Sequence, residues 1–136
     1  MALDEAVSRI VAIGVGCRAG VAGDTIARLV RLALDEFGEP QGEPRLFTFA
    51  GKATEPGIVE AARLIGAKLT PLPLAALQAQ AERVLTPSKA AAARFGAPNV
   101  AEAAALAGAG VGARLLGPRL AKDGATCAIA LSVERT

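Results

Sequence analysis

The stretch Gly14-Val15-Gly16-Cys17-Arg18-Ala19-Gly20 indicates an α/β fold. It follows an apolar run typical of a buried strand, and it precedes a segment with helical periodicity that begins near Gly23. Glycines permit a tight turn and a close approach of the backbone to a ligand. The N-terminus of the following helix offers unpaired N–H donors with a partial positive charge, and Arg18 adds a full one. We therefore predict that this turn lies at the ligand-binding edge of the molecule.

The composition indicates a globular protein. Of the 136 residues, 52% are hydrophobic and 21% are charged, so we expect a single domain, 1–136, with a substantial core. The apolar runs are too short to cross a bilayer. The N-terminal segment carries Asp4 and Glu5 and lacks the basic cluster of a signal peptide. The sequence therefore predicts a cytoplasmic protein without a membrane anchor.

Charge and residue content exclude several classes of site. A net charge of +2, with four Phe and no Tyr or Trp, is unlike a dedicated nucleic-acid-binding protein. The chain contains no His, which excludes within it a Ser-His-Asp triad, a Cys-His pair and His-ligated zinc. Cys17 and Cys127 do not have the spacing of a metal-binding motif. We therefore expect no metal and no cofactor.

Hydrophobic periodicity predicts alternating strands and helices. The five expected strands cover residues 8–15, 45–49, 68–72, 113–116 and 125–133. The first expected helix follows the glycine turn and ends before Gly38. The second has Pro56 at its first position, with Thr54 or Glu55 as the cap, and ends at Gly66.

The second half of the chain is predicted to be helical before two final strands. The pattern is helical for roughly thirty residues from Leu74, with a new start at Thr86-Pro87 and a capping box at Asn99-Val100-Ala101-Glu102. Residues 117–124 are too few for a parallel crossover, so the last two strands are antiparallel if they are neighbours. With no repeat and no linker, the sequence predicts a three-layer α/β/α fold on a five-stranded, mostly parallel sheet whose last strand is antiparallel.

Five segments together resemble one family, the cobalamin-biosynthesis family of CobE and the C-terminal domain of CbiG. They follow the family's order and span nearly the whole chain. The segments are GVGCRAG (14–20), KATEPG (52–57), PLPLAAL (71–77), TPSKAAAARFGAPNVAEAAAL (86–106) and GATCAIA (124–130). The length resembles the free-standing CobE form, because CbiG-type proteins carry a further N-terminal domain.

The resemblance implies a role in building the corrin ring. CbiG-type proteins are associated with hydrolytic opening of the ring lactone of a cobalt-precorrin, whereas the free-standing form belongs to the aerobic route. The expected ligand is a precorrin or corrinoid intermediate, and other enzymes of the pathway are expected partners. Two positions depart from the family. Val21 and Ala22 stand where many relatives have hydroxyl residues, and Arg119 stands in a turn where a Lys is expected.

A corrin precursor is an apolar macrocycle ringed by acetate and propionate carboxylates, so its binding site needs apolar surface, N–H donors and separated cations. In open α/β sheets, ligands bind beyond the carboxyl ends of the strands. The predicted ligand-binding residues are Gly14, Gly16, Cys17, Arg18, Gly20, Lys52, Ser88, Lys89, Glu102 and Arg119. For a hydrolytic reaction, the candidate catalytic residues are Lys52 and Glu55, with N–H groups of the glycine turn as an oxyanion hole.

Each candidate also has a structural explanation. The glycines can serve chain reversal and close packing alone, and the cations can be solvated surface charges. Glu55 can complement the start of a helix, and Glu102 can be the last member of the capping box. Ser88 and Lys89 lie in the first turn of the helix predicted after Pro87. Its N–H groups and the Lys89 cation can bind a carboxylate of the ligand, or the two residues can have only a structural role in the helix. Cys17 can be a nucleophile activated by a helix N-terminus or a small core residue.

Three functions compete at this point. The first is a protein that binds a corrinoid intermediate, either as a hydrolase or as a carrier. A hydrolase needs proton-transfer residues, which are few in this chain, whereas a carrier needs no catalytic group. The second is a Rossmann-type nucleotide-binding domain. Gly14, Gly16 and Gly20 approach the dinucleotide-binding motif, but the third glycine comes one residue late. Lys52 stands where a carboxylate that binds the ribose would be expected. The third is a non-catalytic interaction subunit or homodimer, in which small residues between Ala90 and Ala107 pack on a partner rather than in the core.

Overall fold

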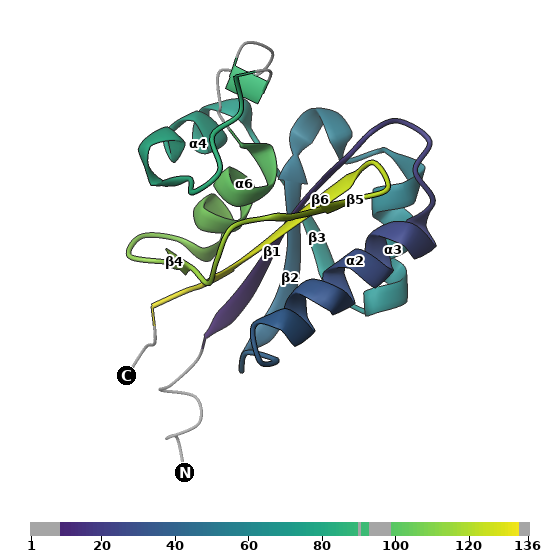
Figure 1. Ribbon diagram of the computed structural model, residues 1–136, viewed down its shortest axis with the longest axis horizontal. Helices are drawn as coiled ribbons and strands as arrows, with labels where there is room; N and C mark the ends of the chain where they lie inside the picture. The colour runs from purple at the N-terminus through teal and green to yellow at the C-terminus, as the bar shows by residue number, and fades with distance from the viewer. Residues whose placement is uncertain (1–8, 90, 93–98, 134–136) are drawn as a thin grey trace.

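The computed structural model describes residues 9–89, 91–92 and 99–133, which form a layered α/β arrangement (Figure 1). The strands are β1 (Ile10–Cys17), β2 (Glu43–Phe49), β3 (Lys68–Leu72), β4 (Arg114–Leu115), β5 (Leu120–Lys122) and β6 (Ala125–Leu131). The helices are α2 (Gly23–Glu36), α3 (Pro56–Ile65), α4 (Leu74–Gln78) and α6 (Val100–Ala109), with 3-10 turns η1 (Ala50–Lys52) and η2 (Ala81–Arg83).

The sheet has the order β3-β2-β1-β6-β4, and β5 also pairs with β6. Strands β1, β2 and β3 are parallel, whereas β6 runs antiparallel to β1, β4 and β5. All strands except β6 therefore point the same way. This arrangement confirms the predicted mostly parallel sheet with an antiparallel last strand, and β4 and β6 are antiparallel neighbours as expected.

The sheet has six strands rather than the predicted five, because residues 117–124, which were predicted only to connect the last two strands, contain β5. A two-residue turn joins β5 to β6, and its residues Asp123 and Gly124 have positive φ angles of 53° and 83°. These angles are those of the hairpin turn that an Asp-Gly pair favours. The Asp-Gly pair was therefore a sequence signal for the missing strand.

The side chains of β1 alternate between two faces of the sheet. Val11, Ile13 and Val15 pack with buried residues of α2 and α3, whereas Ala12 packs with α6. Figure 1 shows α2 and α3 on one side of the sheet and α4 and α6 on the other. The predicted three-layer α/β/α architecture is confirmed, and its core lies on both faces of the central strand.

Gly14 allows α6 to lie directly on β1. A Cβ atom on Gly14 would lie 2.0 Å from the carbonyl oxygen of Ala101 and 2.6 Å from the backbone nitrogen of Ala105. The small residues of α6 are equally close-packed, and Ala103 and Ala104 are fully buried. Of the two explanations for the Ala-rich stretch, core packing therefore holds for α6. Residues 93–98 lie outside the described part of the chain.

The helix boundaries follow the predicted stop signals. Pro56 is the first residue of α3, and Gly66 ends it with a φ of 76°. Ala22 precedes α2 and makes no side-chain capping hydrogen bond, because its methyl side chain has no acceptor. Among the described residues, no helix combines the length and the apolar character needed to cross a membrane.

Within the described residues, the helical region after β3 is more broken than predicted. Its described parts are α4, η2 and a helical turn that follows Ser88, whose hydroxyl accepts a hydrogen bond from the Ala91 N–H at 3.2 Å. Thr86 was the predicted cap of this turn, but its hydroxyl donates instead to the Glu102 carboxylate. The predicted helix start at Thr86-Pro87 is therefore wrong by two residues, because a distant acceptor binds Thr86. Its continuation through 93–98 is outside the described residues.

Candidate functional site

A pocket of about 680 Å³ lies at the carboxyl ends of β1 and β2, beside the β5–β6 hairpin. Its lining comes from several parts of the chain: the β1–α2 turn, the end of β2, the hairpin, the N-terminus of α6 and Arg119. Its size is within the range of small-molecule sites, about 300–1,000 Å³. Its position is the one at which α/β sheets bind ligands.

The wall of this pocket is strongly cationic. Arg18, Lys52, Arg119 and Lys122 line it, against one acidic residue, Asp123. Within the described part of the chain, the side chains of Arg18, Arg119 and Lys122 make no ion pair. Their charges are therefore available to an anionic ligand, and the four cations come from three separate parts of the chain.

The floor of the pocket is neutral. The buried Thr48 hydroxyl donates to the carbonyl oxygen of Val15 at 2.9 Å, and the Thr126 hydroxyl donates to the carbonyl oxygen of Gly16 at 3.4 Å. Apolar surface comes from Phe49 and from the α6 residue Val100. The pocket therefore combines a neutral, partly apolar floor with a positively charged rim.

Glu55 binds the glycine turn from behind the pocket. Its Oε2 accepts a hydrogen bond from the Gly20 N–H at 3.0 Å, and its Oε1 lies 3.6 Å from the Lys52 Nζ. Glu55 precedes α3, but its side chain does not cap that helix. It lines a separate, smaller depression, whereas Lys52 lines the cationic pocket. The two candidate catalytic residues are thus paired, but only one of them lines the pocket.

The N–H donors of the glycine turn are largely used within the chain. Gly20 donates to Glu55, and the Arg18 N–H donates to the carbonyl oxygen of Gly124 at 2.9 Å. Two of the N–H groups in the predicted oxyanion hole are therefore bonded by distant loops of the chain, and ligand contact by the glycine turn stays a prediction. The charge of this edge comes from side chains instead.

Neither cysteine has an activated thiol. Burial raises the pKa of the Cys17 thiol, and the neighbouring Lys52 ammonium offsets only part of this rise. Burial also raises the pKa of Cys127, which lies in β6, to about 12. Both thiols are free. Among the described residues, no group of His, Cys, Asp or Glu side chains is suited to hold a metal ion.

Glu102 and Arg119, which are far apart in sequence, meet at one side of the pocket. Glu102 is fully buried, and its carboxylate accepts a hydrogen bond from the Arg119 N–H. The Asn99 side chain accepts a hydrogen bond from the Glu102 N–H, so the half of the predicted capping box that involves the Asn99 side chain is present. The Arg119 and Asn99 side chains line the pocket, but Glu102 does not. Glu102 therefore has a structural explanation, and Arg119 stays a ligand-binding candidate.

The remaining candidates divide between the pocket and its surroundings. Gly16 and Cys17 line the pocket, whereas Gly14 is covered by α6 and Gly20 belongs to the depression behind the turn. Ser88 and the exposed Lys89 do not line the pocket, although their neighbour Ala91 does. Ligand contact by these outer residues stays a prediction.

Two charged pocket residues were missed by sequence reasoning. Lys122 and Asp123 lie at the tip of the β5–β6 hairpin, which β-pairing folds back beside the end of β1. The sequence signal for the hairpin was the Asp-Gly turn. The position of its tip next to Arg18 depends on the pairing of β6 with β1, which that local signal does not predict.

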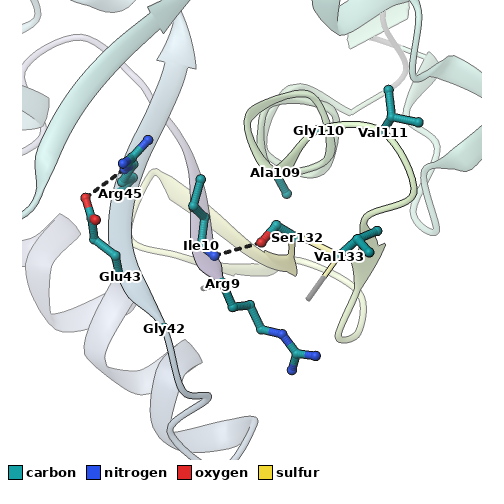
Figure 2. Close-up of a pocket in the computed structure, with 10 residues that line it drawn as sticks. All are labelled: Arg9, Ile10, Gly42, Glu43, Arg45, Ala109, Gly110, Val111, Ser132 and Val133. Carbon is teal, nitrogen blue, oxygen red and sulfur yellow. Dashed lines mark hydrogen bonds and ion pairs between the residues drawn. The ribbon is translucent and has the colours of Figure 1, made fainter. Parts of the chain in front are cut away.

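A second pocket, of about 880 Å³, lies at the other end of β1 (Figure 2). Its lining includes Arg9, Glu43 and Arg45. The Arg45 Nε donates a hydrogen bond to the Glu43 carboxylate at 2.8 Å, and this hydrogen bond lowers the pKa of Glu43. On another side of the pocket, the Ile10 N–H donates to the Ser132 hydroxyl at 2.7 Å. This larger pocket has a smaller excess of positive charge and lies at the amino ends of the parallel strands. We therefore take the cationic pocket as the candidate site.

Comparisons with known proteins agree with this architecture. The family described as "Cobalamin synthesis G C-terminus" matches residues 11–130. Protein CobE of Sinorhizobium sp. is 34% identical over 119 residues, which cover 87% of this chain and 77% of that protein.

Two solved structures share the fold. The crystal structure of CobE, a protein from the cobalamin biosynthetic pathway, superposes with a TM-score of 0.83 at 34% identity, over 96% of this chain and 94% of that one. The cobalamin biosynthesis protein chiG from Agrobacterium tumefaciens superposes with a TM-score of 0.68 at 39% identity, over 90% and 98% of the two chains. The family match, the curated relative and the shared fold together show that this chain belongs to the CobE/CbiG C-terminal family of cobalamin biosynthesis proteins.

Proposed function

We propose that the cationic pocket binds a precorrin or corrinoid intermediate by the carboxylate arms of its ring. The observation that carries this proposal is the charge of the pocket, which has four basic side chains and one acidic side chain around a neutral floor. Carboxylates that radiate from a macrocycle match cations that are separated in space. Each contact is a charge-assisted hydrogen bond, which is stronger than a neutral one.

The geometry favours a carrier over a hydrolase. Lys52 lines the pocket, but its partner Glu55 lies behind the glycine turn and binds Gly20. The N–H groups of Arg18 and Gly20, which would serve as an oxyanion hole, are bonded within the chain. A general base has to reach the water molecule that it activates. The proposed role is therefore to bind and shelter an intermediate for other enzymes of the pathway.

The alternative of a nucleotide-binding domain receives no support from the glycine turn. A dinucleotide's pyrophosphate binds to the N–H donors at this position. Here the Glu55 carboxylate accepts the Gly20 N–H, so a negative charge of the protein already lies at the turn. Failure of NAD(P) or ATP to raise the melting temperature is the expected result.

The test uses cobyrinic acid, a corrin that carries free acetate and propionate arms, with its methyl ester as the uncharged control. Binding is followed by the visible absorbance of the corrin, which is separate from protein absorbance. We expect the acid to bind more tightly than the ester and to bind more weakly as salt concentration rises. The Arg18→Ala, Lys52→Ala double variant is expected to weaken binding of the acid about tenfold or more.

The matched control is Arg45→Ala, which removes a cation from the second pocket. It is expected to leave the affinity for cobyrinic acid unchanged. Equal binding of acid and ester, or a larger loss in Arg45→Ala than in the double variant, would overturn the proposal.

A further inference from the structure

Four donors from two distant segments converge on the carboxylate of Glu102. The N–H groups of Leu85 and Thr86 donate to Oε1 at 2.7 and 2.9 Å. The Thr86 hydroxyl and the Arg119 N–H donate to Oε2, both at 2.8 Å. The Glu102 side chain is fully buried. Such a carboxylate fixes the relative positions of the segments that it joins.

Asn99 closes the same junction. Its Oδ1 accepts the Glu102 N–H at 3.0 Å, and its Nδ2 donates to the carbonyl oxygen of Thr86 at 2.8 Å. The chain therefore leaves this junction at Thr86 and returns to it at Asn99. Because Asn99 and Arg119 both line the cationic pocket, the junction forms the back of one pocket wall.

Helix capping alone does not explain Glu102. The cap is made by the Asn99 side chain and the backbone N–H of residue 102, which any residue would supply. In a capping box the glutamate side chain returns to the N–H of the capping residue. Here the carboxylate binds Leu85, Thr86 and Arg119 instead. These long-range hydrogen bonds, rather than the helix cap, explain why a carboxylate side chain stands at position 102.

We propose that Glu102 is a positioning residue for the ligand site, which holds the backbone of Arg119 so that its guanidinium faces the pocket. This inference rests on the proposed function. Glu102 does not line the pocket, so it acts through Arg119 and not by ligand contact. A glutamine at this position has one acceptor oxygen and presents an NH₂ group to donors, so it cannot satisfy the junction.

The test is a double-mutant cycle in which cobyrinic acid is the probe. Arg119→Ala is expected to weaken its binding about five- to tenfold, and Glu102→Gln to weaken it by a similar factor or less. In the Arg119→Ala background, Glu102→Gln is expected to change binding by less than about twofold, because the side chain that it positions is gone. A general loss of structure would weaken binding equally in both backgrounds.

Glu43→Gln is the matched control, since it removes the same charge at the second pocket. It is expected to leave the affinity unchanged. Thr86→Val is a milder second variant that removes one donor to Oε2, in case Glu102→Gln does not fold. It is expected to weaken binding about twofold, and this effect is also expected to disappear in the Arg119→Ala background.

The outcomes separate the two proposals. No binding of cobyrinic acid to the wild-type protein overturns the proposed function and this inference with it. Normal wild-type binding with no loss in Glu102→Gln, or with equal losses in both backgrounds, overturns only the positioning role. A loss that depends on the Arg119 side chain supports it.

Discussion

The Glu55 carboxylate accepts a hydrogen bond from the Gly20 N–H at 3.0 Å, although 35 positions separate the two residues in sequence. The glycine turn, which has the sequence of an anion site, thus binds an anion of its own chain. The second oxygen of this carboxylate lies 3.6 Å from the Lys52 ammonium. Glu55 therefore connects the β1–α2 turn to a cation of the pocket.

Glu55→Gln is expected to strengthen the binding of cobyrinic acid about twofold, since it frees the Lys52 charge for the ligand. A titration of the corrin absorbance measures this change. Glu60→Gln, which removes the same charge from an exposed pair with Arg63, is the control and is expected to have no effect. Weaker binding in Glu55→Gln would contradict a ligand-binding role for Lys52.

Gly14→Ala is expected to destabilise the protein by about 3 kcal/mol or more, because its Cβ would overlap the backbone of α6. Gly38→Ala is the control. Gly38 has a φ of 76° and open space around it, so the substitution adds only backbone strain, about 1 kcal/mol. Urea denaturation measures both. A smaller loss for Gly14→Ala than for Gly38→Ala would contradict the close packing of α6 on β1.

Glu102→Ala is expected to lower the free energy of unfolding by about 3–5 kcal/mol, since it leaves several buried donors without an acceptor. Amide hydrogen exchange is expected to become faster at Arg119 and Thr86. Glu60→Ala, at an exposed site, is expected to change stability by about 0.5 kcal/mol or less. Unchanged exchange at Arg119 would show that the carboxylate does not hold this segment.

The buried thiol of Cys127 is expected to make the protein less stable at alkaline pH. Its pKa is about 12 in the folded protein against an ordinary value of 9.0, so above pH 9 the unfolded chain releases a proton that the folded chain retains. Stability therefore falls as pH rises from 9, by up to about 4 kcal/mol near pH 12. Denaturation curves of wild type and Cys127→Ala, compared across this range, measure the effect, which the variant is expected to lose. Parallel pH profiles would contradict it.

Cys17 is expected to react slowly with iodoacetamide at neutral pH, because burial raises its pKa and thiolate is the reactive form. Cys127→Ala serves as the background, so that a single thiol is followed. The Lys52 charge lowers the pKa of Cys17 and the Glu55 charge raises it. Lys52→Ala should therefore shift the rate profile to higher pH, and Glu55→Gln should shift it to lower pH. Shifts in the reverse directions would contradict the placement of these charges.

Much of the architecture could be predicted from local patterns. The continuous apolar run of β1 and the stop signals at Gly38 and Gly66 predicted the first strand and the ends of the first two helices, because these signals depend on neighbouring residues only. The short β5 was missed, although Asp123-Gly124 carried its turn signal. The helix start near Pro87 was misplaced, because the Thr86 hydroxyl binds a carboxylate 16 positions away.

The candidate site was predictable in position but not in detail. Residues that follow parallel strands meet at one edge of the sheet, so Arg18 and Lys52 could be placed together in advance. The contribution of Lys122 depended on the hairpin that folds it beside β1. The packing of α6 over Gly14 depended on a helix that starts some eighty residues later, which no local pattern describes.

The order of amino acids alone was enough for the α/β class, the cationic edge and the family resemblance, since propensity, periodicity and motif order are all local properties. Three-dimensional packing decided which groups remain for a ligand. Hydrogen bonds between distant segments used the N–H groups of Arg18 and Gly20 and buried Glu102, while the charged side chains of Arg18, Arg119 and Lys122 were left at the pocket. A buried polar group has to be satisfied by whatever lies beside it, and only the fold determines that neighbour.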